Sequence, residues 1–89
     1  MIKYKLKTLK GGGACPEQYF GRTIDDLSVY VRLRGGWASL EIGEILVDET
    51  QYPNDPYKVC FENNELAIFM LRNFEPDKAL INFLYHNMN

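Results

Sequence analysis

The amino-acid sequence predicts an α+β fold, in which a twisted antiparallel β-sheet of five or six strands carries a C-terminal α-helix packed on one face. Three features support this prediction: a tight hairpin around Gly35-Gly36, alternating segments before and after it, and an amphipathic C-terminal segment. Eighty-nine residues of ordinary apolar and charged content suffice for one modest core. We therefore expect a single compact domain over residues 1–89.

The first strand is predicted over Ile2–Leu9, where apolar side chains at positions 2, 4 and 6 alternate with lysines at 3, 5 and 7. Lysines on one face also suit a strand at the edge of a sheet. The segment Gly11–Pro16 interrupts the alternation and predicts a loop.

A second strand is predicted over Gln18–Ile24, with a turn at Asp25-Asp26. A two-residue loop would turn Arg22 toward the core, whereas a three-residue loop turns Tyr19, Gly21 and Thr23 there. We prefer the three-residue loop, because burying an unpaired arginine is costly.

The segment Ser28–Gly43 predicts a hairpin whose two-residue turn, Gly35-Gly36, needs positive φ angles. This turn sets the register, and a slip by one residue would mix the two faces of the hairpin. On one face Val29, Val31 and Leu33 lie opposite Ile42, Leu40 and Ala38, and on the other Tyr30, Arg32 and Arg34 lie opposite Glu41, Ser39 and Trp37.

Beyond the hairpin, Ile45–Val47 is suited to prolong the strand, and the polar segment Asp48–Pro56 contains two prolines that oppose regular pairing. Tyr57–Glu62 alternates again. The apolar run Leu66–Leu71 suits either a strand paired across Asn63-Asn64 or a helix capped by one of these asparagines. Its short length favours the strand narrowly.

The clearest helix is predicted over Pro76–Met88, because proline and acidic residues suit the first turn of a helix. Its apolar stripe consists of Leu80, Ile81, Phe83, Leu84 and Met88, and its polar stripe consists of Lys78, Asn82 and His86.

The net charge of −2 conceals a polarity along the chain. Residues 1–36 hold seven basic and three acidic residues, for a net charge of +4, and residues 37–89 hold three basic and nine acidic residues, for −6. Such a polarity steers charged partners only if the halves stay apart in space.

Cys15 and Cys60 lack the pattern of a disulfide scaffold, and no apolar run predicts a leader or a membrane span. We expect a cytoplasmic protein with reduced thiols.

The sequence offers weak candidates for catalysis or metal binding. His86, the single histidine, falls on the polar stripe of the predicted helix, and Cys15 with His86 would lack a third, orienting group. The triple glycine lacks the Lys-Ser/Thr of a phosphate loop, and DETQYPND lacks the glycine of a calcium loop. We therefore expect no enzyme, cofactor or metal site.

The outer face of the hairpin is the candidate partner-binding site. Arginine and aromatic side chains on one surface suit a protein interface or single-stranded nucleic acid, although stacking of Arg34 on Trp37, or cover by the helix, would make them structural. The predicted binding residues are Tyr30, Arg32, Arg34, Trp37 and Glu41.

The leading hypothesis from the sequence is a small non-enzymatic interaction module that occludes a surface of a larger protein. Phage-encoded inhibitors of bacterial defence systems, such as anti-CRISPR proteins, and toxin-immunity proteins act in this way. Because the second half is acidic and could imitate nucleic acid, the partner could be a nucleic-acid-processing complex. The alternative is a single-stranded nucleic-acid-binding protein that uses the aromatic-basic hairpin face. The sequence sets no oligomeric state.

Overall fold

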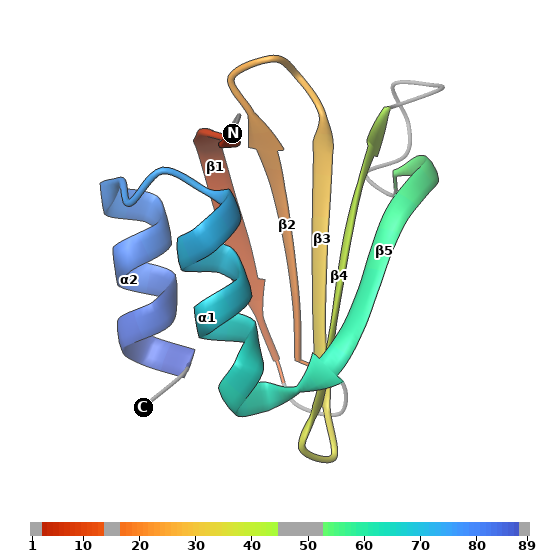
Figure 1. Ribbon diagram of the computed structural model, residues 1–89, viewed down its shortest axis with the longest axis vertical. Helices are drawn as coiled ribbons and strands as arrows, with labels where there is room; N and C mark the ends of the chain where they lie inside the picture. Colours follow the sequence, from red (N-terminus) through yellow and green to blue (C-terminus); the bar gives the residue numbers. More distant parts are fainter. Residues whose placement is uncertain (1–2, 14–16, 45–52, 88–89) are drawn as a thin grey trace.

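The computed structural model describes residues 3–13, 17–44 and 53–87, and confirms the α+β class (Figure 1). Within these residues, five strands form one antiparallel sheet in the order β1-β2-β3-β4-β5, so that each strand pairs with the next one along the chain. Two helices follow the sheet (Figure 1). The elements are β1 (Leu6–Gly12), β2 (Glu17–Thr23), β3 (Ser28–Arg34), β4 (Trp37–Glu44), β5 (Asn54–Glu62), α1 (Asn63–Asn73) and α2 (Lys78–Asn87).

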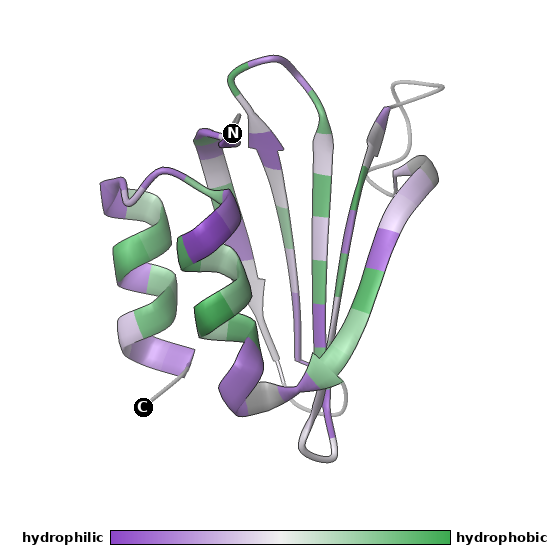
Figure 2. Cartoon of the chain, viewed as in Figure 1, coloured by the Kyte–Doolittle hydropathy of each residue, from purple (hydrophilic) through white to green (hydrophobic). Residues whose placement is uncertain are grey.

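The register of the β3–β4 hairpin is confirmed at every predicted pair. Gly35 and Gly36 have φ angles of +59° and +83°, and a type I′ turn requires positive φ at both central residues. Val29 and Val31 are fully buried, whereas Arg32 and Arg34 are exposed. Hydropathy accordingly alternates along β3 in Figure 2.

The turn between β2 and β3 has the predicted three-residue loop. The Thr23 N–H donates to the Leu27 carbonyl at 3.0 Å, and the Asp26 N–H donates to the Thr23 carbonyl at 3.0 Å. Asp26 has a φ of +63°, which closes a loop of this length with the right twist and which aspartate tolerates better than most residues. Arg22 consequently pairs with Ser28 on the outer face, and Thr23 is buried.

The bounds of β1 differ from those predicted at both ends. A β-bulge at Lys7 places three residues of β1, from Leu6 to Thr8, against two of β2, so that Leu6 and Leu9 both face the core. The strand continues through Gly11 and Gly12, which we expected in a loop. Gly11 pairs with Tyr19 where a Cβ atom would overlap the Gln18 carbonyl oxygen, so only glycine fits there.

The residues 54–56, which we expected in an irregular segment, belong to β5. The sheet accommodates Pro56 because β5 is an edge strand, where a missing N–H need not break a ladder. The register also shifts by one residue between Ile42 and Glu44 of β4. The predictions for Ile45–Val47 and for residues 48–52 lie outside the described residues.

The strand that we favoured narrowly over Leu66–Leu71 is wrong, because this run lies inside α1. Leu66, Met70 and Phe74 are spaced four residues apart and are all fully buried, as one stripe of a helix requires. The helix includes polar residues on both sides of the run and extends from Asn63 to Asn73. Its N-cap residue is Glu62, and not Asn63 or Asn64 as the helical alternative predicted.

The predicted C-terminal helix is confirmed as α2, although it begins at Lys78 and not at Pro76. Asp77 is the N-cap: its side chain accepts from the Leu80 N–H at 2.9 Å, and its carbonyl accepts from the Ile81 N–H at 3.0 Å. Leu80 and Phe83 are buried, whereas Ile81 is 47% exposed. Met88 lies outside the described residues.

Both helices pack on one face of the sheet. The buried side chains of α1, α2 and the inner faces of β1, β3 and β4 form one core cluster, with α1 against β4 and β5 and α2 against β1. The link between the helices is fixed where Phe74 forms a parallel bridge with Tyr4. No described helix or strand packs on the opposite, outer face of the sheet, where Arg32, Arg34 and Trp37 are exposed (Figure 1).

Tyr19 of β2 contacts the C-terminal end of α2 through its ring and its hydroxyl group. Its ring meets Phe83 edge-to-face at 4.8 Å, and its hydroxyl lies 2.6 Å from Asn87 Oδ1 and 2.5 Å from Glu17 Oε2. Burial of the phenol, reinforced by the neighbouring Glu17 carboxylate, raises the pKa of Tyr19 to about 12. The folded state therefore favours the protonated phenol, which can donate to either acceptor.

We predict that Val31→Asp abolishes cooperative thermal unfolding. The substitution places an unpaired carboxylate at a fully buried position among aliphatic side chains, at a cost of about 4 kcal/mol or more. The matched control is Arg32→Asp, one residue further along β3 on the outer face, which should unfold cooperatively. Melting followed by circular dichroism tests both, and a parent-like transition in Val31→Asp would contradict the register.

We predict that Tyr19→Phe lowers the free energy of unfolding by about 1 kcal/mol at neutral pH, because it removes the hydroxyl and keeps the ring. Since folding raises the pKa from 10.0 to about 12, the contribution is complete below pH 10 and is lost as pH rises toward 12. Urea unfolding of both proteins across this range should show their difference shrinking. A difference that stays constant or grows would mean that the hydroxyl is not held in its neutral form.

Candidate interaction surface

The outer face of the sheet carries the residues that the sequence predicted for binding. Arg32 lies in register between Gln18 of β2 and Ser39 of β4, and Cys60 of β5 follows Ser39 in the same row. Arg34 lies opposite Trp37 at the turn end of the hairpin. The indole of Trp37 is 62% exposed. The sheet therefore presents two guanidinium groups beside an accessible indole.

These side chains surround a shallow hollow of about 380 Å³. Lys58 of β5 adds a third cation, and among the described residues no carboxylate lines the hollow itself, although Glu41 and Glu62 pair with Lys58 and Trp37 beside it. We call this site the outer hollow, and its lining residues are Arg32, Arg34, Trp37, Ala38, Ser39, Lys58 and Cys60. A hollow lined by three cations and an indole is suited to an anionic partner.

Sequence analysis missed Lys58 and Cys60. The alternation of Tyr57, Val59 and Phe61 contained the signal, because it turns positions 58 and 60 to the other face of the same strand. The pairing of β5 with β4 could not be predicted from the sequence, and this pairing places Lys58 beside Glu41 and Cys60 beside Ser39.

The remaining two predicted residues lie on the outer face but outside the hollow. Tyr30 is only 6% exposed, because its ring packs against Phe20 at 4.9 Å and its hydroxyl donates to Gln18 Oε1 at 2.9 Å. Glu41 is half-buried in the row between Tyr30 and Lys58. The structure therefore holds the ring of Tyr30 within the protein and does not present it to a partner.

The weaker candidates gain no support from the geometry. His86 is exposed on α2, with its ring 5.3 Å from that of Tyr85, and Cys15 lies outside the described residues, so that a Cys15–His86 pair is not placed. Among the described residues no group of three or more histidine, cysteine, aspartate or glutamate side chains could hold a metal ion. Cys60 is an exposed free thiol.

Comparison of the chain with protein-family models, curated proteins and solved structures gave no match. Neither α1 nor α2, the helices of the described residues, is long and apolar enough to cross a membrane.

We predict that Tyr30→Phe lowers the free energy of unfolding by about 1 kcal/mol and leaves partner binding unchanged. The variant loses the hydrogen bond to Gln18 and keeps the buried ring that packs on Phe20. Chemical denaturation measures the first effect, and titration of a captured partner measures the second. A binding loss with unchanged stability would show that the hydroxyl reaches a partner directly.

Proposed function

We propose that this chain is a small, non-enzymatic protein-interaction module that inhibits or modulates a larger protein by covering an acidic patch on its surface. The observation that carries the proposal is the outer hollow, which Arg32, Arg34 and Lys58 line together with the exposed Trp37. Arginine and tryptophan are the residue types that most often dominate the energy of protein interfaces.

The sheet supports this role by holding the arginines rigidly. Arg32 and Arg34 are two residues apart on one strand, so they point to the same side with Cα atoms about 7 Å apart. Each guanidinium group can form paired hydrogen bonds to a carboxylate, and Trp37, opposite Arg34, supplies apolar contact area beside the turn. A partner surface that presents carboxylates around a small apolar patch would complement this arrangement.

Single-stranded nucleic acid is the alternative partner, supported by the three cations of the outer hollow. Stacking of successive bases needs several accessible rings, however, and the buried ring of Tyr30 cannot serve as one of them. This difference favours a protein partner.

We propose that the chain acts by steric occlusion, as phage-encoded inhibitors of bacterial defence systems and toxin-immunity proteins do. The proposed target is a nucleic-acid-processing complex. The free, exposed thiol of Cys60 at the hollow supports a reducing, cytoplasmic setting.

The test is capture of partners from lysate on the immobilised chain, with and without nuclease treatment, followed by titration of the captured partner. We predict that Arg32→Glu with Arg34→Glu weakens binding by about 2 kcal/mol or more, because both hot-spot cations are reversed. The matched control is Lys3→Glu with Lys5→Glu, which changes the net charge equally at exposed positions outside the outer hollow.

The proposal is supported if a partner protein is still captured after nuclease treatment and if its binding is weakened in the arginine variant but not in the lysine control. Recovery of nucleic acid alone, with affinity that falls steeply with salt and with a loss of about 1–3 kcal/mol in Trp37→Ala, would support the alternative instead. Equal binding by the arginine variant and the control would contradict a role for the outer face.

A further inference from the structure

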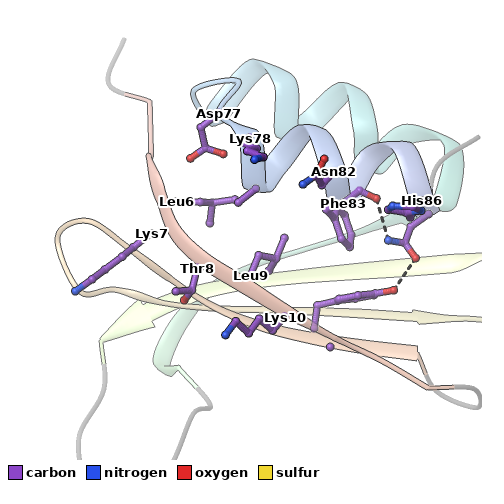
Figure 3. Close-up of a pocket in the computed structure, with 14 residues that line it drawn as sticks. Leu6, Lys7, Thr8, Leu9, Lys10, Asp77, Lys78, Asn82, Phe83 and His86 are labelled. Carbon is purple, nitrogen blue, oxygen red and sulfur yellow. Dashed lines mark hydrogen bonds between the residues drawn. The ribbon is translucent and has the colours of Figure 1, made fainter.

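A groove of about 850 Å³ runs between β1 and α2, away from the outer hollow (Figure 3). One wall consists of the consecutive residues 6–11 of β1, and the other consists of α2 positions 78, 79, 82, 83, 86 and 87, together with Asp77. The helix positions repeat every four residues, so one face of α2 borders the groove along its whole length. The groove and the outer hollow share no residue.

The β1 wall is the backbone edge of the strand. Successive side chains of a strand point to opposite faces, so a hollow lined by six consecutive residues must follow the edge. β1 is the first strand of the described sheet, and among the described strands it pairs with β2 alone. Every second residue of an antiparallel edge strand turns its N–H and C=O groups away from its neighbour, and here they face the groove.

The chain itself already adds an extended segment at the start of this edge. The Tyr4 N–H donates to the Asn73 carbonyl at 2.8 Å, and the Glu75 N–H donates to the Tyr4 carbonyl at 2.8 Å, in a parallel bridge. Lys5, the next residue, accepts from Ile24 on the opposite, β2 side. The groove begins where this pairing stops, since Asp77 is the first lining residue after the bridge.

Apolar side chains lie deep in the groove and cations lie along its rim. Leu6 and Phe83 are buried at its base, beside the half-buried Leu9 (Figure 3). Lys10 and Lys78 are exposed, and neither has an ion-pair partner among the described residues. The one carboxylate of the lining, Asp77, already caps α2 through its hydrogen bond to the Leu80 N–H.

We propose that this groove binds an extended acidic segment of a partner protein, which pairs with the free edge of β1 as an additional strand. Alternate side chains of the segment would face the apolar base, and its carboxylates would reach Lys10 and Lys78. The lined length of β1, at about 3.3 Å per residue, accommodates about five residues of such a strand. This site is separate from the one in the proposed function and is testable without it.

The probe is a synthetic peptide of about six alternating valine and glutamate residues with blocked ends, titrated into ¹⁵N-labelled protein. We expect saturable shifts of the amide resonances of β1 and α2. Three further peptides isolate the interactions. One with lysine in place of glutamate should not bind. The other two are methylated at every second backbone nitrogen, one on the valines and one on the glutamates, and the peptide whose methyl groups replace the N–H groups that face β1 should bind at least about tenfold more weakly than the unmethylated peptide.

Two variants test the protein side. Lys10→Glu with Lys78→Glu should weaken the valine-glutamate peptide by about tenfold or more, whereas Lys3→Glu with Lys5→Glu should bind like the parent. Arg32→Glu with Arg34→Glu should also bind like the parent, so failure at the outer face and failure at the groove are distinguishable. Circular dichroism verifies that each variant is folded, and the peptide comparisons need no variant.

Three results would overturn the proposal. The first is an absence of shifts in β1 and α2 at millimolar valine-glutamate peptide. The second is an affinity of both methylated peptides that equals that of the unmethylated peptide, which would exclude strand addition. The third is a concentration-dependent shift of the same amides without any peptide, which would identify a second copy of this chain as the occupant.

Discussion

The arrangement of this protein depends on the register of one hairpin. Gly35 and Gly36 both adopt positive φ angles, and that turn closes only with Arg34 opposite Trp37. A slip by one residue would carry Val31 to the outer face and Arg32 into the core, beneath the helices. The same two glycines therefore place the aliphatic layer that the helices cover and leave the guanidinium groups exposed on the other side.

The turns of this fold could be predicted from neighbouring residues alone. The cost of burying Arg22 was enough to predict the three-residue loop, and Asp26 closes it with a positive φ. The sequence signals were insufficient where a long-range contact decides the outcome. Six apolar residues over Leu66–Leu71 suit a helix almost as well as the strand that we favoured narrowly, and the packing of Leu66, Met70 and Phe74 in the core selects the helix.

The candidate surfaces follow the same division. Arg32, Arg34 and Trp37 could be assigned to one face from alternation alone. The burial of Tyr30 could not, because it arises from Phe20 on a neighbouring strand, and Lys58 joins the outer hollow only through the β4–β5 pairing. The groove needs contact between the first strand and the last helix, so no local pattern could have predicted it.

The fold also changes the meaning of the charge polarity along the chain. Lys58 and Lys78 belong to the acidic second half, yet the first lines the outer hollow with Arg32 and Arg34 and the second faces β1 across the groove. At physiological ionic strength charges interact over roughly 8 Å, so these local clusters matter more to a partner than the net charge of −2. An acidic chain with a pI near 5.3 can in this way present two separate surfaces that both favour anionic groups. Because the two surfaces share no residue, occupation of one does not sterically require the other to be empty.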